Sequence, residues 1–260
     1  QKRNWKYKSK TNILKKKLLF FGHSGNLGSN FIYFLKNDFN FILNINEKKL
    51  YFPDVEYIYL KKKDFLKNPD HIKDKIKSIS PDLILNSAAC TNLDLCQKSP
   101  KKTAFVNYIL PSILSKICLE LKIKFIHIST DHLYKKNIPY KDEKLKTSKV
   151  NNYSYQKIKA ENLIVKNNKN ALIIRTNFFS HSSNSKQLIY KIKNSINDKN
   201  KITLFNDYYF TPIYSKYLCK IINYLIKKDN IGVFNIVSDE RISKYNFGKL
   251  FLKKIQNEKD

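Results

Sequence analysis

Short apolar runs alternate along this chain with longer stretches in which apolar residues recur at helical spacing. Several runs are apolar on consecutive residues, as in LLFFG and DLILNSA, which is typical of strands covered on both faces. The stretches between them, such as PSILSKICLELK and YQKIKAENLIVKN, have the spacing of amphipathic helices. This alternation predicts an α/β fold with a doubly wound parallel sheet. The expected strands are residues 18–22, 41–46, 55–60, 82–88, 124–130 and 171–176.

The pattern changes at both ends of the chain. Residues 1–14 are basic and show no apolar periodicity, so we expect an N-terminal arm there. Residues 15–176 form the expected main domain. Within residues 177–260, KITLF and GVFNIVS read as isolated strands among helices, which predicts a smaller C-terminal substrate lobe, interleaved with the main domain. A chain of 260 residues is long enough for this arrangement.

The net charge of +29 raises the question of nucleic-acid binding. Of the 50 basic residues, 47 are lysine, and the three arginines are Arg3, Arg175 and Arg241. Proteins that read bases and phosphates usually rely on the bidentate guanidinium group. The lysines are spread along the whole chain together with many Asn and Ile residues, which indicates a coding bias expressed on solvated faces. We therefore expect no specific nucleic-acid partner, although the positive field favours anionic ligands.

The sequence predicts no membrane span, because no apolar run approaches the ~20 residues that a bilayer requires. The segment QKRNWKYKSK is not followed by the apolar region of a signal peptide. The four cysteines lack the spacing of a metal site, and no histidine pair accompanies them. We expect free thiols in a reducing cytoplasm and no bound metal.

The first expected strand runs directly into GHSGNLGSN, in which Gly22, Gly25 and Gly28 have the spacing GxxGxxG. Three of the five glycines of the chain fall in this one turn. A tight turn from strand to helix needs glycine for backbone freedom, and the helix amides then face a pyrophosphate. The context therefore predicts a Rossmann-like dinucleotide site.

The end of the second strand bears on the choice of cofactor. A site for NAD usually places an acidic residue there, whereas this strand ends at Asn46, followed by Lys48 and Lys49. The two cations favour a 2′-phosphate and hence NADPH, while Glu47 keeps NADH open as the alternative. Asp64, after the third strand, could hydrogen-bond an adenine amine.

The segment NYSYQKIKAE holds two tyrosine–lysine pairs at helical spacing, Tyr153 with Lys157 and Tyr155 with Lys159. A lysine one turn from a tyrosine can lower the pKa of the phenol, so that it exchanges a proton. On a helical wheel the first pair continues into an apolar stripe and the second into a polar one. A catalytic phenol must be covered and oriented, so Tyr153 and Lys157 are the favoured pair.

A third group for this chemistry comes from FIHISTDHLY. Ser129 and Thr130 close a buried strand at the carboxyl edge, where α/β sheets place their ligands. A hydroxyl group there could hold a substrate carbonyl while Tyr153 donates a proton.

These motifs together resemble a known family. GHSGNLG, DLILNSAACTNLD, AFVN, HISTDHLY, NNYSYQKIKAE, LIIRT and FNDYYFTPIY fall in the order and spacing of extended short-chain dehydrogenases/reductases. The chain is most similar to the dTDP-4-dehydrorhamnose reductases, over roughly residues 17–252. The resemblance implies that Thr130 is the hydroxyl of the triad, Tyr153 the acid and Lys157 the residue that binds the ribose. It also places Glu161 four residues after the lysine, which selects the same frame as the helical wheel.

The resemblance implies further site residues. Asn107 would help order the catalytic strand, and Asp207 and Pro212 would lie in the segment that leads into the lobe. The expected cofactor contacts are Gly22, Ser24, Gly25, Asn26, Leu27, Gly28, Asn46, Asp64, Phe65, Ala88, Ala89, Tyr153 and Lys157. The expected substrate contacts are Thr91, Asp131, Asn177 and Thr211.

The implied reaction is reduction of a nucleotide-linked 4-keto-6-deoxysugar by NADPH or NADH, with a homodimer among the expected partners. The chain departs from the family in the loop DHLYKKNIPY, which lacks the usual glycine. Most members also continue a few dozen residues beyond Gln256, so a shortened lobe is expected. Two alternatives stay open. One is an epimerase or dehydratase of the same fold, and the other is a non-catalytic NADP-binding regulatory subunit of the methionine adenosyltransferase β type.

Overall fold

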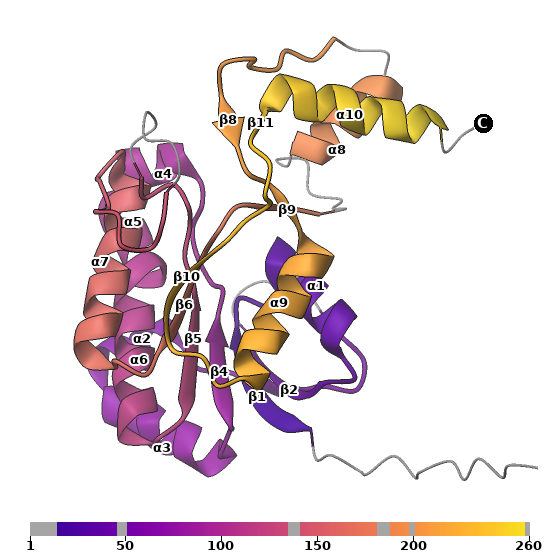
Figure 1. The fold of residues 1–260 in the computed structure, drawn as a ribbon. Helices are drawn as coiled ribbons and strands as arrows, with labels where there is room; N and C mark the ends of the chain where they lie inside the picture. The colour runs from indigo at the N-terminus through magenta and orange to yellow at the C-terminus, as the bar shows by residue number, and fades with distance from the viewer. Residues whose placement is uncertain (1–14, 46–50, 135–140, 181–187, 198–200, 258–260) are drawn as a thin grey trace, which may run out of the picture.

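The computed structural model describes residues 15–45, 51–134, 141–180, 188–197 and 201–257. The expected arm at residues 1–14 lies outside them. A sheet of seven strands, all paired in parallel, forms the centre of the molecule in the order β10-β6-β5-β4-β1-β2-β3 (Figure 1). The predicted doubly wound parallel sheet is thereby confirmed. The strands are β1 Lys16–Phe21, β2 Phe39–Asn44, β3 Glu56–Ile58, β4 Leu83–Asn86, β5 Lys124–Ile128, β6 Leu172–Thr176 and β10 Gly232–Ile236.

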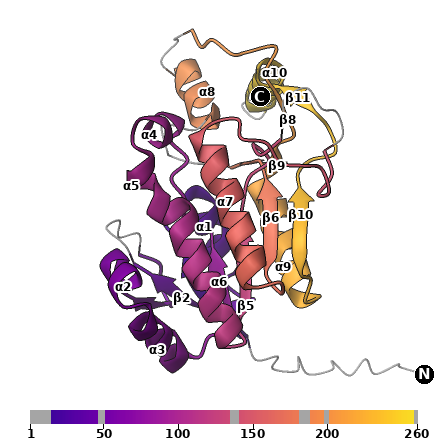
Figure 2. The same ribbon diagram turned by 90° about the vertical axis from the view of Figure 1, so that its left-hand side faces the viewer.

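Helices cover both faces of the sheet (Figures 1 and 2). One face carries α1 Asn26–Leu35 and α9 Ser215–Lys227, which pack against each other. The opposite face carries the remaining helices of the main domain, including a π-helical turn, η1. These are α2 Lys62–Lys67, α3 Pro69–Ile79, α4 Leu93–Lys98, α5 Pro100–Ala104, η1 Phe105–Ile109, α6 Leu110–Glu120 and α7 Asn152–Asn167.

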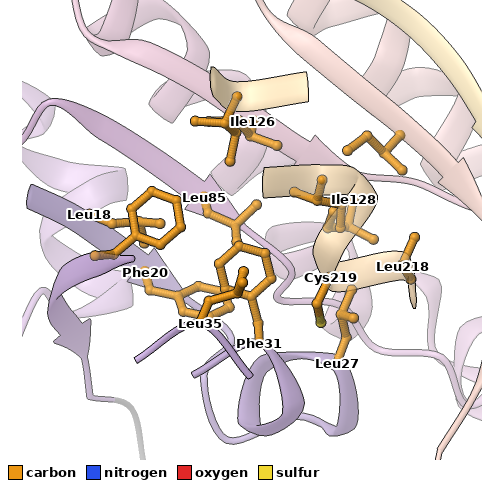
Figure 3. Close-up of a cluster of buried hydrophobic side chains, with 14 of the residues drawn as sticks. Leu18, Phe20, Leu27, Phe31, Leu35, Leu85, Ile126, Ile128, Leu218 and Cys219 are labelled. Atoms are coloured by element: carbon orange, nitrogen blue, oxygen red, sulfur yellow. The ribbon is translucent and has the colours of Figure 1, made fainter. Parts of the chain in front are cut away.

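The consecutive apolar residues of β1 serve two cores. Leu18 and Phe20 point to the face of α1 and α9, where they join Phe31 and Leu218 (Figure 3). The alternate residues of the strand point to the other face and pack with side chains of α3, α6 and α7. Successive side chains of a strand point to opposite faces, so a strand covered on both sides needs apolar residues throughout.

A smaller lobe lies beyond one edge of the sheet (Figure 1). Its helices are α8 Leu188–Asn197 and α10 Lys244–Asn257. The short strands β7 Phe178–Phe179 and β9 Ile213–Tyr214 pair in parallel, and β8 Tyr209–Phe210 pairs antiparallel with β11 Ile242–Ser243. In Figure 2 the strands β6 and β10 point towards this lobe.

Two expectations for this region were wrong. GVFNIVS is not an isolated strand, because its first five residues form β10, which pairs with β6 in the main sheet. The helix α9 precedes β10 in the chain and packs on α1, so it brings the chain back to the main sheet. The periodicity of apolar residues within a segment does not reveal such a crossover. KITLF, residues 201–205, forms no strand. No neighbouring strand pairs with it among the described residues.

The core on the α1 side predicts a clear difference between two aromatic residues of one helix. Phe31 is fully buried, whereas Tyr33 is 71% exposed. We expect Phe31→Ala to lower the free energy of unfolding by about 3–5 kcal/mol, because it leaves a cavity among the rings around Phe20. Tyr33→Ala should change it by less than about 0.5 kcal/mol. Urea denaturation measures both, and equal losses would contradict the assignment of this core.

Candidate active site

The turn between β1 and α1 has the geometry that the glycine motif predicts. Gly22 has a φ of 91°, a conformation that L side chains rarely adopt. A Cβ on Gly28 would lie only 2.2 Å from the Gly22 carbonyl oxygen, so α1 packs directly on the turn. Gly25 caps α1 without a side-chain hydrogen bond, and the first turn of the helix holds no acidic residue. The N-terminal amides of α1 are therefore suited to an anion.

The loop after β4 lies against this turn. A Cβ on Gly22 would lie 2.4 Å from the backbone nitrogen of Ala88, and Ala89 follows directly. The strand order reverses between β1 and β4. Ligands of doubly wound sheets bind at such a switch point, beyond the carboxyl ends of the strands. The structure thus brings together the glycine turn and the two alanines that the sequence predicted for the cofactor.

The other predicted cofactor contacts have varied surroundings. Ser24 is exposed, Leu27 lies in the core, and the Asn26 side chain accepts a hydrogen bond from Ser180. Asp64 lies in the first turn of α2 and is partly buried. The Phe65 ring is 2% exposed and lies 6.1 Å from the Phe21 ring, so this side chain belongs to the core. Asn46, with the neighbouring residues 47–49, lies outside the described residues.

The start of α7 is fixed by a capping box. The Asn151 side chain accepts from the Ser154 backbone, and the Ser154 hydroxyl accepts from the Asn151 backbone, at 2.8 and 2.9 Å. Because the start is fixed, the faces of the helix are fixed too. Tyr153 and Lys157 are 8% and 1% exposed, whereas Tyr155 is 45% exposed. The helical wheel therefore selected the buried pair.

Lys157 is held by the strand next to its helix. Its Nζ donates to the Ile128 carbonyl oxygen at 2.8 Å and lies 2.9 Å from His127 Nε2. Burial lowers the pKa of Lys157 to about 8, although Glu161 opposes this shift. Burial, with the nearby Lys157 charge, also holds the pKa of His127 well below its usual range. His127 is therefore a neutral ring in a dry interior.

Thr130 meets Tyr153 at the carboxyl end of β5. The two hydroxyl groups are hydrogen-bonded, and both side chains are buried. Burial raises the pKa of Tyr153, while the bond to Thr130 lowers it by a smaller amount. The structure thus places two of the predicted catalytic side chains, Thr130 and Tyr153, against each other, and the third, Lys157, is buried one helical turn further along α7. The raised pKa of Tyr153 keeps the phenol protonated at neutral pH.

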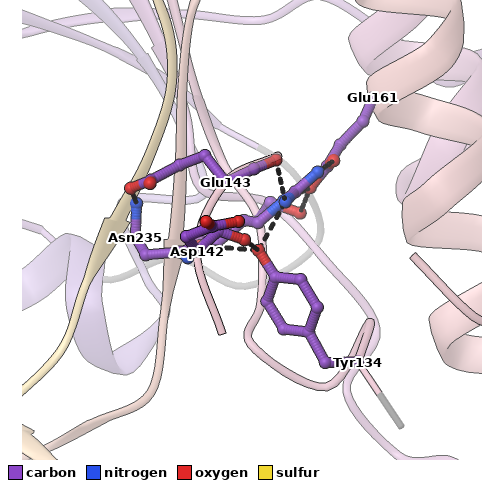
Figure 4. Close-up of polar contacts among 7 residues, drawn as sticks. Tyr134, Asp142, Glu143, Glu161 and Asn235 are labelled. Carbon is purple, nitrogen blue, oxygen red and sulfur yellow. Dashed lines mark hydrogen bonds and ion pairs between the residues drawn. The ribbon is translucent and has the colours of Figure 1, made fainter. Parts of the chain in front are cut away.

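A buried ion pair supports this arrangement. Arg175 binds both carboxylate oxygens of Glu161, and its Nη2 lies 2.7 Å from Oε2 (Figure 4). Glu161 also accepts from the hydroxyl of Ser129, the residue before Thr130. Arg175 Nη1 donates to the Tyr134 hydroxyl at 2.6 Å, and that hydroxyl also bonds Asn235 of β10. The network joins α7 to three neighbouring strands or their loops.

Asn107 has a different role from the one expected. Its side chain bonds both backbone groups of Cys90, in the loop after β4, and donates to Gln156 of α7 at 2.7 Å. It therefore orders the β4 loop rather than the strand that carries Thr130. It lies in the π-helical turn η1, a feature that often occurs at functional sites.

A cavity of about 280 Å³ opens between the sheet edge and the lobe. Asn177 lines it and donates to Asp131 at 3.2 Å, so two predicted substrate residues lie together. Burial raises the pKa of Asp131. Thr91 and Thr211 do not line the cavity; Thr91 is exposed and Thr211 follows β8. The remaining lining residues, which sequence reasoning missed, are His132, Phe178, Phe179, Leu188, Ile189, Tyr208, Phe210, Lys244 and Phe247.

Five of the missed residues are Phe or Tyr, a feature that the sequence does show. Aromatic residues are dense in TNFF, NDYYF and KYNF, but these segments lie far apart in the chain. Only the pairing of β8 with β11 and of β7 with β9 brings them around one cavity. In the described part of the chain, no group of three or more His, Cys, Asp or Glu side chains is arranged to hold a metal ion. No helix in that part is long and apolar enough to cross a membrane.

The parallel sheet, the glycine turn at its switch point and the Thr130–Tyr153–Lys157 cluster define the class as an extended short-chain dehydrogenase/reductase. The sequence of residues 16–260 matches the model of the RmlD substrate binding domain, so the chain belongs to that family. The resemblance to dTDP-4-dehydrorhamnose reductases is thereby confirmed at the level of the family.

Known proteins similar to this chain fit the same family. A probable low-salt glycan biosynthesis reductase, Agl14 of Haloferax volcanii, is 25% identical over 173 residues, which cover 65% of this chain and 58% of the relative. The dTDP-4-dehydrorhamnose reductase of Escherichia coli K12 is 23% identical over 190 residues, which cover 70% and 63%. The match thus spans less than two thirds of each relative.

A solved structure supports the fold. The dTDP-4-dehydrorhamnose reductase of Bacillus anthracis, in complex with NADP, superposes with a TM-score of 0.78 at 20% identity. The superposition covers 95% of this chain and 83% of that one.

The ion pair behind the site predicts a large loss of stability when one partner is removed. Glu161→Ala leaves the Arg175 guanidinium buried without its carboxylate, and we expect a loss of about 3–5 kcal/mol. Glu120→Ala, which removes a partly exposed pair with Lys73, should cost much less, because solvent screens such a pair. Urea denaturation compares them. A loss in Glu161→Ala no larger than in the control would show that the network carries little energy.

The lowered pKa of Lys157 predicts a pH-dependent stability. The unfolded chain holds the Lys157 proton up to about pH 10.5, and the folded protein only up to about 8. Between these values the unfolded state binds more protons, so the contribution of Lys157 to stability rises with pH, by about 3 kcal/mol. Lys157→Met should therefore gain most over the wild type below pH 8 and lose that gain towards pH 10.5.

The matched control for this prediction is Lys159→Met, two residues along the same helix and partly exposed. Its difference from the wild type should stay nearly constant with pH. Denaturation curves at several pH values measure both differences. A Lys157→Met difference that is as flat as the control would contradict the burial of a titrating amine.

Proposed function

We propose that this chain is an NADPH-dependent reductase of a nucleotide-linked 4-keto-6-deoxysugar, with dTDP-4-dehydrorhamnose, which yields dTDP-L-rhamnose, as the favoured substrate. The observation that carries the proposal is that Tyr153 lies against Thr130 at the carboxyl end of β5, with Lys157 buried one turn further along the helix of Tyr153. Membership of the family and the names of the relatives support the substrate class.

The residues present fit a dinucleotide. The uncapped start of α1 offers free backbone amides, and a Cβ on Gly25 would meet only the Gly22 carbonyl oxygen, so the turn is open on its outer side. Bound NADPH would supply hydride to C4 of the keto sugar. NADH is the alternative cofactor, and the similar structure that contains NADP favours NADPH.

Each residue of the cluster has a role in the proposed reaction. Tyr153 donates its proton to the oxygen at C4 as negative charge develops there. Thr130 holds that oxygen by a hydrogen bond. Lys157 lies one helical turn after Tyr153 in α7. Its amine can bind the ribose of the cofactor and, as an ammonium, lower the pKa of Tyr153. The aromatic cavity lined by Phe179 and Phe210 is suited to the planar base of the nucleotide.

The proposal is tested by following nicotinamide absorbance with dTDP-4-dehydrorhamnose made in situ. We expect Tyr153→Phe to lower kcat by about 100-fold or more, because the proton donor is lost. Tyr155→Phe, the matched control on the exposed face, should retain nearly full activity.

Other outcomes point to the alternatives. Binding of NADPH without any oxidation of it would contradict the reductase proposal and favour a regulatory homologue. Tightly retained NAD with epimerisation of a sugar would favour the epimerase or dehydratase hypothesis. A homodimer and a cytoplasmic location stay predictions, which sedimentation and fractionation would test.

A further inference from the structure

Two cysteine side chains lie side by side where the loop after β4 meets the helix α4. Cys90 is half-buried, whereas Cys96 is fully buried. The Cys96 thiol donates to the Cys90 carbonyl oxygen at 3.4 Å, and a hydrogen bond also joins the two thiol groups. The chain thus holds two sulfur atoms in contact, which a disulfide bond requires.

The sequence around the start of α4 explains this contact. Asn92 caps the helix, because its side chain accepts from the Leu95 backbone at 3.0 Å. Residues just before an N-cap often turn back over the first turn of their helix. Cys90 precedes the cap and Cys96 follows it at the end of the first turn. The cap therefore brings the two residues together.

Asn107 of η1 holds both cysteines in place. Its side chain bonds the backbone nitrogen and oxygen of Cys90 at 2.7 and 3.1 Å, and its Nδ2 lies 3.6 Å from the Cys96 sulfur. Asn107 is fully buried and donates to Gln156 of α7, so its orientation is fixed. In this arrangement Cys96 keeps the hydrogen that it donates to Cys90. The reduced pair is therefore the resting state.

The pair lies between the cofactor turn and the candidate catalytic tyrosine. Ala88, in the same loop as Cys90, packs on the glycine turn, where a Cβ on Gly22 would lie 2.4 Å from the Ala88 nitrogen. Both thiols also lie near Tyr153, because each contributes to the raised pKa of that phenol. A covalent change at Cys90 and Cys96 therefore acts on the loop against which a bound dinucleotide must fit.

We propose that Cys90 and Cys96 form a thiol–disulfide modification site, at which oxidation by a hydroperoxide weakens binding of the dinucleotide. The Cys90 sulfur attacks the peroxide, the O–O bond breaks, and Cys90 becomes a sulfenic acid while water or an alcohol leaves. The Cys96 sulfur then attacks the Cys90 sulfur, and the hydroxyl group leaves as water with the Cys96 proton. One peroxide thus takes two electrons from the two thiols.

Burial assigns the two steps to the two residues. Cys90 is the thiol that solvent reaches, whereas burial raises the pKa of Cys96 and keeps it protonated. Side-chain hydrogen bonds from Thr103 and Asn107 oppose this shift and stabilise the Cys96 thiolate as it forms. The disulfide closes only a short loop, residues 91–95, and loses the hydrogen bond from the Cys96 thiol. A dithiol reductant therefore reopens it readily.

The first measurement is mass spectrometry of the full chain after treatment with hydrogen peroxide. Residues 78–98 form one tryptic peptide that holds both cysteines, because no Lys or Arg lies between Lys77 and Lys98. We expect this peptide to lose the mass of two hydrogen atoms, to resist alkylation, and to regain both thiols in dithiothreitol. A sulfinic or sulfonic acid at Cys90 without a disulfide, or a disulfide from Cys90 to another cysteine, would overturn the proposal.

The second measurement is a titration of the same samples with NADPH. We expect the Kd to rise about tenfold on oxidation, as expected for the loss of one hydrogen bond to a charged pyrophosphate. Dithiothreitol should restore it. A protein that carries the disulfide and still binds NADPH as tightly as the reduced form would overturn the link to the cofactor. The titration needs no sugar, so its outcome is independent of the substrate proposed above.

Three variants identify the sulfurs responsible. Cys90→Ser and Cys96→Ser each remove one sulfur, so neither should show a loss of NADPH affinity that dithiothreitol reverses. Cys118→Ser, the matched control, removes a buried cysteine of α6 and should respond to peroxide as the wild type does. If Cys96→Ser does not fold, the half-buried Cys90→Ser gives the same comparison. A reversible loss of affinity in Cys90→Ser as large as in the wild type would overturn the proposal.

Discussion

The buried ion pair between Glu161 and Arg175 is the interaction on which the geometry of the site depends. Charges in a dry interior are tolerated only when they are paired and hydrogen-bonded, so this pair fixes α7 against β6. The same carboxylate accepts from Ser129, which brings the end of β5 to the same point. Thr130 follows Ser129, and Lys157 lies one helical turn before Glu161. The placement of Thr130 and Lys157 therefore follows from electrostatic pairing as well as from packing of apolar faces.

The period of α7 places the candidate catalytic side chains on one face. Tyr153, Lys157 and Glu161 are spaced by four residues and share the buried face, in the order of proposed proton donor, amine and ion-pair anchor. Residues so spaced lie above one another along a helix. The capping box of Asn151 and Ser154 sets the first turn, and the ion pair sets the third. Lys157 is held between them, so its amine has little freedom to leave β5.

Most of the main domain could be predicted because its signals are local. Consecutive apolar residues such as Leu18 and Phe20 indicate strands with a core on each face, and the wheel of α7 separates Tyr153 from Tyr155. β10 could not be recognised as part of the main sheet, because its partner β6 lies about 60 residues earlier and the crossover decides the pairing. Nor did sequence single out His127, which looks like any polar residue in a strand until its partners, 41 and 30 residues away, are known.

Burial decides the protonation state of the two titrating groups on this face of α7. It disfavours both charged forms, the phenolate of Tyr153 and the ammonium of Lys157. It therefore raises the pKa of Tyr153 and lowers that of Lys157 to about 8. The phenol keeps its proton at neutral pH, and the Lys157 amine is still mostly protonated there. The resting site thus holds both protons, which is the state that proton donation by Tyr153 requires.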